Sequence, residues 1–223
     1  MTQQILVYGD SLSWGIVPGT RERLPFEQRW PPIMERHLVG AGHQVRVIED
    51  ALNGRRTVWD DPFKAGRNGL VGLEQRIEIN SPLALVILML GINDFQTVHQ
   101  HNAWHSSQGV AALVRAIRRA PIEPGMPVPG VLVVAPPPAG TARGEMAPKF
   151  AGADTRGAGL AQALQQVAAE LACAFFDAGR VIRASDVDGV HLDASQHAIL
   201  GRELAEVVAP LLVRAPLGAA VSP

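Results

Sequence analysis

The sequence has a single cysteine, Cys173, so no disulfide can form within the chain. Cys173 lies in the apolar segment LACAFF, which favours a buried structural thiol over a reactive one. Charged residues amount to 18% and the formal net charge is -1, which gives no electrostatic reason to expect nucleic acid or an anionic membrane as a partner. No apolar run approaches the roughly 20 residues of a membrane span, and the first residues lack the basic and apolar regions of a signal peptide. We therefore expect a cytoplasmic protein without a membrane segment.

The apolar content is sufficient for one folded domain. The 223 residues are 47% hydrophobic, and this length and composition suit a single globular domain with a buried core. We expect the domain to span residues 1–214. Residues 215–223 are small and contain proline and glycine, so we expect them to form a flexible tail or a subunit contact.

Short apolar runs alternate with longer segments of helical periodicity, a pattern typical of an α/β fold with a mostly parallel sheet. The run at 83–90 is apolar on both faces, so we expect it to be central. The expected strands are residues 5–8, 44–48, 83–90, 130–135 and 174–177. The expected helices are residues 30–39, 106–119 and 155–173, with a last helix that Asp193 or Ser195 caps and that reaches residue 212.

Polar clusters follow several of these strands, where an open parallel sheet forms its ligand crevice. The first is Gly9-Asp10-Ser11-Leu12. A serine placed directly after a strand exposes its hydroxyl near backbone N–H groups that can bind an oxyanion. The alternative is that Asp10 or Ser11 only caps a helix.

The second cluster, near the end of the chain, places Asp188 three residues before His191. At that separation a turn can direct the carboxylate to the imidazole Nδ1, which leaves Nε2 free to accept a serine proton. Alone, this pair would be an ordinary surface turn. Together with Ser11 it supplies a nucleophile, a base and a group that orients the base.

Two further clusters can supply oxyanion donors. Asn93 follows the central strand, where its side-chain amide can donate to a tetrahedral intermediate; the alternative is an Asx-turn. Gly54 follows the second strand and can bring its backbone N–H close to a substrate, although an ordinary Asn-Gly turn is the alternative.

In this order and at these strand ends, the clusters resemble the SGNH-hydrolase (GDSL-type) superfamily. The first block of the family is GDSLSWG here, the second-block glycine matches Gly54, Gly-x-Asn-Asp matches residues 91–94, and Asp-x-x-His matches residues 188–191. The resemblance covers nearly the whole chain and implies a three-layer α/β/α fold of the flavodoxin-like kind. It also implies a catalytic triad of Ser11, Asp188 and His191 and an oxyanion hole of Ser11, Gly54 and Asn93, with no cofactor and no metal.

Within the superfamily, segments such as EQRWPPIMERHL, VIEDALNGRRTVWDDP and LVILMLGINDF look like the bacterial arylesterase/acyltransferase branch. The resemblance implies a homo-oligomeric serine esterase for short-chain aryl, alkyl or acetyl esters, acting through an acyl-enzyme. Two departures leave acyl transfer to alcohols open. Gly54 stands where those enzymes often have alanine, and the region 92–129 differs, with His99, His101 and Trp104 after the third block.

Three other functions stay open. A carbohydrate acetylesterase is the nearest, since Gly54-Arg55 also resembles the sugar-deacetylating SGNH enzymes. A thioesterase or lysophospholipase would need a long apolar groove. From a different class, the chain could be a binding module without catalytic activity, against which the intact nucleophile, base and oxyanion donors argue.

The remaining predictions concern the surroundings of the site. Residues beside the catalytic segments are expected to line the substrate pocket: Asp10, Leu12, Trp14, Phe95, Pro138 and Val190. Arg55 and Arg56 are expected to pair with Asp60 or Asp61 and hold the loop of Gly54. His101 and His105 have a helical metal-ligand spacing, but only His99 is nearby as a third ligand, so we expect a solvated loop.

Overall fold

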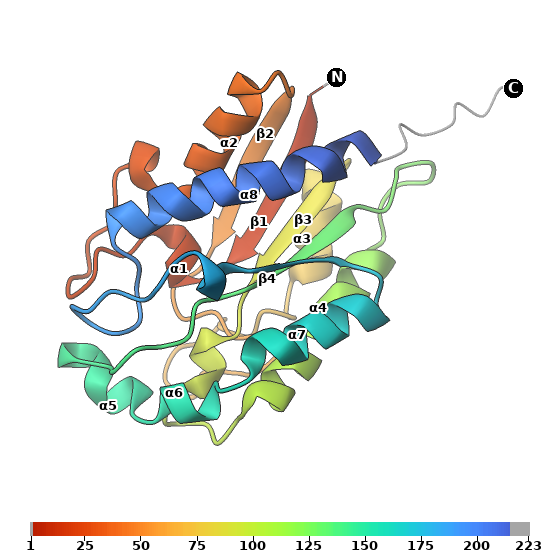
Figure 1. The fold of residues 1–223 in the computed structure, drawn as a ribbon. Coiled ribbons are helices and arrows are strands. Elements are labelled where there is room, and N and C mark those ends of the chain that lie inside the picture. The colour runs from red at the N-terminus through yellow and green to blue at the C-terminus, as the bar shows by residue number, and fades with distance from the viewer. Residues whose placement is uncertain (1, 215–223) are drawn as a thin grey trace, which may run out of the picture.

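The computed structural model describes residues 2–214. In that range five parallel strands form one sheet in the order β2-β1-β3-β4-β5 (Figure 1). The central strand β3 is buried along its whole length, as its two apolar faces predicted. The predicted α/β fold with a parallel five-stranded sheet is therefore confirmed. The strands are β1 (Gln3–Gly9), β2 (Val45–Ala51), β3 (Leu85–Met89), β4 (Gly130–Ala135) and β5 (Ala174–Asp177).

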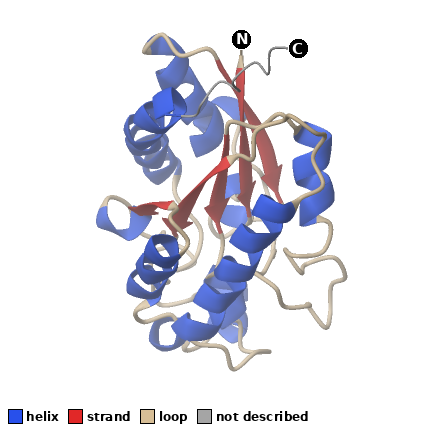
Figure 2. Ribbon diagram, turned by 90° about the vertical axis from the view of Figure 1, so that its right-hand side faces the viewer, coloured by secondary structure: helices blue, strands red, loops and turns tan. Residues whose placement is uncertain are grey.

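Helices cover both faces of the sheet and complete three layers (Figure 2). On one face α2 (Trp30–Gly40) packs against α8 (Ala194–Arg214). On the other face lie α3 (Leu73–Asn80), α4 (Ala103–Arg119) and α7 (Leu160–Glu170). The loops at the carboxyl ends of the strands carry short helices: α1 (Ser11–Trp14), α5 (Ala147–Phe150) and α6 (Ala153–Arg156). Single 3-10 turns lie at Phe26–Gln28, Ile92–Phe95, Gly144–Met146 and Ala178–Arg180.

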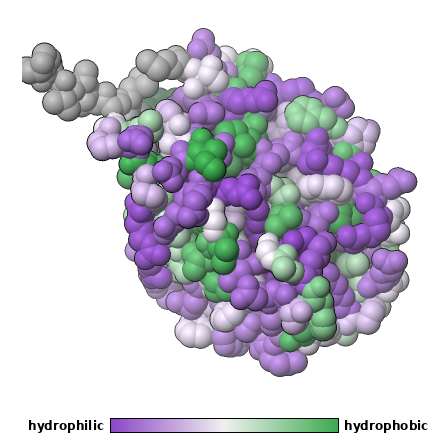
Figure 3. Space-filling model, turned by 180° about the vertical axis from the view of Figure 1, so that it is seen from behind, coloured by the Kyte–Doolittle hydropathy of each residue, from purple (hydrophilic) through white to green (hydrophobic). Residues whose placement is uncertain are grey.

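The apolar side chains gather between the layers. Trp30, Tyr8 and Met34 are among the large side chains that are almost fully buried there. Seen from behind, the surface is mainly hydrophilic, and its hydrophobic residues form separate small groups (Figure 3). Cys173 is only half-buried, but burial still raises the pKa of its thiol, in keeping with a structural role. None of the helices within residues 2–214 is long and apolar enough to cross a membrane.

Several element boundaries differ from the sequence predictions. The predicted helix at 155–173 is wrong, because a turn at residues 157–159 separates α6 from α7 and Gly159 has a left-handed φ of 82°. Helix α3 was not predicted. Helix α4 begins three residues before the predicted start at residue 106. The Asn102 side chain accepts the His105 N–H and so caps the helix. Asp193, not Ser195, precedes α8; its carbonyl accepts the Gln196 and His197 N–H groups, while its Oδ1 accepts the Ser185 hydroxyl. The predicted tail at 215–223 lies outside the described residues.

Candidate active site

The site begins where β1 ends. Asp10 follows the strand and caps α1, because its Oδ1 accepts the Leu12 N–H at 2.9 Å. Ser11 is the first residue of that helix and is 5% exposed. A first helical residue has no acceptor for its N–H within the helix, so the Ser11 amide is left for a ligand. The parallel order of the sheet brings the ends of β1, β2 and β3 together around this serine.

Ser11, His191 and Asp188 form a chain of hydrogen bonds. The Ser11 Oγ lies 3.2 Å from the His191 Nε2, and the His191 Nδ1 lies 2.7 Å from the Asp188 Oδ2. Since Asp188 can only accept when ionised, Nδ1 carries the proton and Nε2 faces the serine as an acceptor. The sequence separation of serine and histidine is 180 residues, yet the fold brings the two side chains together.

A tight turn holds Asp188 in place. Its Oδ1 accepts the Val190 and His191 N–H groups, each at 2.9 Å, and its Oδ2 also accepts the Gly19 N–H at 3.2 Å. Gly189 permits the turn with a φ of 76°. Burial would raise the pKa of Asp188, but the hydrogen bonds from His191 and the backbone outweigh it and hold that pKa well below its ordinary value. The carboxylate therefore stays ionised beside the imidazole.

Asn93 points its amide into the same place. Its Nδ2 donates to the Asp10 Oδ2 at 2.8 Å and to the Arg55 carbonyl at 3.2 Å, while its Oδ1 accepts from Gln96 at 2.7 Å. Because an ionised carboxylate and a carbonyl only accept, they orient the NH₂ group of the amide. Burial raises the pKa of Asp10 from 3.8 to about 6, and the hydrogen bonds from Leu12 and Asn93 offset only part of this.

Gly54 lies in the turn that follows β2. The Arg55 N–H closes this turn on the Leu52 carbonyl at 2.9 Å, and Gly54 has a φ of 81°. At that position of a turn the N–H points away from the turn's own hydrogen bond. The Gly54 amide is thereby free to face a ligand next to Ser11.

Buried charges anchor this loop. Arg55 binds the Asp50 carboxylate at 2.7 Å and lies 3.8 Å from the centre of the Tyr8 ring, whereas Arg56 pairs with Asp61 at 2.6 Å. The predicted pairing of Arg56 with Asp61 is therefore confirmed, while Arg55 uses Asp50 instead of Asp60 or Asp61. Both arginines have a structural position, as predicted.

A small cavity of about 50 Å³ opens beside Ser11. Of the predicted site residues, Ser11, Gly54, Asn93 and His191 line it. The other lining residues come mainly from irregular loops and were not identified from the sequence: Ile16, Arg21, Asn53, Asp61, Lys64, Met146, Lys149 and Phe150. The cavity is much smaller than a second one, of about 330 Å³, which favours a small group beside Ser11.

The predicted pocket residues are corrected by the structure, since none of the six lines this cavity. Leu12 and Val190 are buried in the apolar core, and Asp10 is buried beneath Asn93. Trp14 is half-buried, with the Arg23 guanidinium over its ring at 4.7 Å. Leu12, Trp14 and Val190 are close to Ser11 or His191 in the sequence, but their side chains do not face the cavity.

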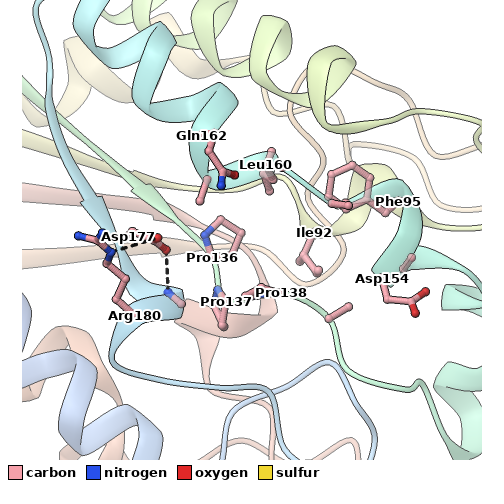
Figure 4. Close-up of a pocket in the computed structure, with 17 residues that line it drawn as sticks. Ile92, Phe95, Pro136, Pro137, Pro138, Asp154, Leu160, Gln162, Asp177 and Arg180 are labelled. Carbon is pink, nitrogen blue, oxygen red and sulfur yellow. Dashed lines mark hydrogen bonds and ion pairs between the residues drawn. The ribbon is translucent and has the colours of Figure 1, made fainter.

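Phe95 and Pro138 line a different cavity, of about 330 Å³, at the ends of β4 and β5. Figure 4 shows these two side chains with Ile92, Leu160 and the polar rim of Asp154, Asp177 and Arg180. It shares no lining residue with the Ser11 cavity within the described part of the chain.

The histidines after the third block have other contacts. The rings of His99 and His101 stack at 4.9 Å, and His101 stacks on Trp59 at 4.0 Å. His105 belongs to the cap of α4. Within residues 2–214, no group of three or more histidine, cysteine or acidic side chains is arranged to hold a metal ion.

The loops at one edge of the parallel sheet bring serine, histidine and aspartate into one row of hydrogen bonds, an arrangement that recurs in serine hydrolases of unrelated folds. A model of the GDSL-like lipase/acylhydrolase family matches residues 7–199, and the chain belongs to this family. Family membership places it among the carboxylic ester hydrolases.

Solved structures with similar sequences share the fold along nearly the whole chain. A carbohydrate acetylesterase from Sinorhizobium meliloti is 34% identical over 94% of this chain and 100% of that one, with a TM-score of 0.89. An aryl esterase from M. smegmatis is 33% identical over the same shares, with a TM-score of 0.88. A putative arylesterase from Agrobacterium tumefaciens is 39% identical over the same shares, with a TM-score of 0.85. A curated arylesterase from Vibrio mimicus is 33% identical over 93 residues, or 42% of this chain and only 38% of that protein.

Proposed function

We propose that the protein is a serine esterase that hydrolyses short-chain carboxylic esters through an acyl-enzyme. The observation that carries the proposal is the chain from Ser11 Oγ to His191 Nε2 at 3.2 Å and from His191 Nδ1 to Asp188 Oδ2 at 2.7 Å. A serine hydroxyl is a weak nucleophile until a neighbouring base accepts its proton. Gly54 and Asn93, which we propose as oxyanion donors with Ser11, line the same cavity and support this role.

The proposed reaction begins when His191 accepts the Ser11 proton as Oγ attacks the ester carbonyl carbon. The carbonyl oxygen becomes an oxyanion, which the Ser11 and Gly54 amides and the Asn93 Nδ2 bind. The Asn93 Nδ2 has two hydrogens, and the one that points to the Arg55 carbonyl makes the longer hydrogen bond, at 3.2 Å. This hydrogen would turn to the oxyanion when the oxyanion forms. His191 then gives its proton to the departing alcohol oxygen, and a water molecule attacks the acyl-enzyme by the same route in reverse.

The size of the cavity supports short acyl groups. At about 50 Å³ it has room for a group such as acetyl beside Ser11, and it offers no long apolar groove. We expect hydrolysis of 4-nitrophenyl esters to fall steeply from acetate to octanoate. A preference for octanoate would instead support the thioesterase or lysophospholipase alternative.

The direct test compares 4-nitrophenyl acetate hydrolysis by the wild type and by Ser11→Ala. We expect the variant to lose a factor on the order of 10⁴ or more, because the triad acts as a unit. Ser13→Ala is the matched control: it removes a buried hydroxyl of the same helix that has no hydrogen-bond partner among the described residues, and it should retain activity. Equal, slow turnover by wild type and Ser11→Ala would contradict the proposal and favour a binding module.

A carbohydrate acetylesterase is the second candidate. The similarity to the Sinorhizobium meliloti acetylesterase over 94% of the chain supports it as much as the arylesterase similarities support the first. Release of acetate from acetylated xylan, compared with aryl acetates, separates the two. Added benzyl alcohol tests acyl transfer in the same assay, since benzyl acetate forms only if an alcohol can replace water.

A further inference from the structure

The two lysines of the chain lie in one place. Among the 20 basic residues of the sequence only Lys64 and Lys149 are lysines, and both line the cavity beside Ser11, together with Arg21. The formal net charge of the whole chain is -1. This gathering of three cations is therefore a local feature of the cavity and does not follow from the overall composition.

The acidic side chain that lines the cavity, Asp61, already has a cationic partner outside this group. Asp61 lines the same cavity, but it pairs at 2.6 Å with Arg56, whose side chain is fully buried. Within residues 2–214 no salt bridge involves Arg21, Lys64 or Lys149. The cavity therefore carries an excess of positive charge.

The three cations are also close enough to affect one another. Partial loss of solvent around the Lys149 ammonium lowers its pKa; Asp61 opposes this effect, and the neighbouring charges of Arg56, Arg21 and Lys64 add to it. A ligand anion among them would relieve this repulsion, since opposite charges in a cleft attract more strongly than on an open surface.

The depth of these residues shows which part of an ester would meet them. Ser11 and His191 are about 95% buried, at 5% and 4% exposure, whereas Arg21, Lys64 and Lys149 are exposed. An acetyl-sized acyl group fills the small space beside Ser11. The alcohol portion of the ester must then extend outward, past the cations, toward solvent.

We propose that the preferred substrates are short-chain esters whose alcohol portion carries a carboxylate, which Lys64, Lys149 and Arg21 bind at the mouth of the cavity. This rests on the proposed esterase function and adds a substrate class to it. The cations attract the anionic ester and orient it with its carbonyl toward Ser11, so the effect is in kcat/KM and weakens with salt.

The test uses two acetate esters of equal size, 4-acetoxybenzoate and 4-acetoxybenzamide, which differ in one negative charge. The measured quantity is the ratio of their kcat/KM values at pH 7.5 and low salt. In a variant with both Lys64→Gln and Lys149→Gln we expect this ratio to fall about three- to tenfold, as for cleft charges that steer a charged ligand. Sodium chloride should lower the ratio for the wild type and have little effect on the double variant.

Arg46→Gln is the matched control. Arg46 is exposed on β2 and lies at the start of that strand, away from the carboxyl ends that carry the site. The Arg46→Gln substitution removes a positive charge that lies outside the cavity, so the ratio of the two kcat/KM values should stay at its wild-type value. An equal fall in this variant would assign the effect to total charge and overturn the proposal.

The two proposals fail in different ways. If the wild type hydrolyses both esters but neither the lysine variant nor salt changes the ratio, the substrate class is wrong and the esterase function stands. If the wild type hydrolyses neither ester faster than Ser11→Ala, the esterase function itself is wrong. The circular dichroism spectrum of the lysine variant, compared with that of the wild type, reports whether the variant is folded.

Discussion

Replacing Asp10 by asparagine is expected to change how the stability of the protein depends on pH. Asp10 is 1% exposed, and burial raises its pKa from 3.8 to about 6 in the folded protein. A group with a raised folded pKa binds its proton more tightly in the folded state, so its stabilising contribution is present below pH 3.8 and is lost as the pH rises through 6. At 1.36 kcal/mol per pKa unit the loss amounts to about 3 kcal/mol.

Asparagine does not titrate, so the Asp10→Asn variant lacks this loss. The free energy of unfolding of the variant minus that of the wild type should therefore increase by about 2 to 3 kcal/mol from pH 4 to pH 8. The new amide would face the Asn93 NH₂ group, a mismatch that shifts the difference equally at every pH. The prediction concerns only the change with pH.

Urea denaturation followed by circular dichroism at several pH values measures this difference. Asp154→Asn is the control, because it removes an exposed carboxylate from the surface. A difference between Asp10→Asn and wild type that is constant from pH 4 to pH 8 would refute the reasoning. It would mean that burial of the Asp10 charge is compensated in the folded protein.

Three further changes test the loops around the site. Arg56→Met should destabilise the protein by about 1 to 3 kcal/mol in urea denaturation, because it leaves the buried Gln96 Oε1 without its donor. Gly109→Ala should lower the Tm, at a cost of about 1 to 3 kcal/mol, since the new Cβ would lie 2.6 Å from the Thr57 Cβ; an unchanged melting curve would show that α4 can shift. Asn93→Ala should lower kcat on 4-nitrophenyl acetate by a factor of about 10² to 10³ with a smaller change in KM, the effect of losing one oxyanion donor; a loss confined to KM would contradict that role.

The fold, and the proximity of Ser11, His191 and Asp188, could be predicted for a physical reason. Each strand is a short apolar run, and the parallel order of such runs places polar residues at one edge of the sheet. Ser11, Gly54 and Asn93 lie within four residues of the end of a strand, so the order of the sheet brings them to the same edge. The local turn from Asp188 to His191 needs only three residues to form its hydrogen bond.

The cavity walls could not be predicted in the same way. Arg21, Lys64 and Lys149 come from three separate segments with no periodicity, and only the folded loops bring them together. Phe95 was expected in the pocket because it is two residues from Asn93, but in the 3-10 turn at Ile92–Phe95 these side chains point to different cavities. The predicted homo-oligomer stays a prediction.

Apolar packing stabilises the sheet, whereas buried polar groups hold the loops of the site in place. Asp94 accepts the Thr57 N–H at 3.0 Å and the Thr57 hydroxyl at 2.7 Å, and burial raises the pKa of its carboxyl. Asp94 is the neighbour of Asn93 in the sequence, and Asp10 accepts from the Asn93 amide, so two carboxyl groups with raised pKa values lie next to this proposed oxyanion donor. Since such groups favour one geometry at the expense of stability, variants that remove them should gain stability at neutral pH and lose activity. The opposite sign of the two effects would distinguish positioning of the site from simple support of the fold.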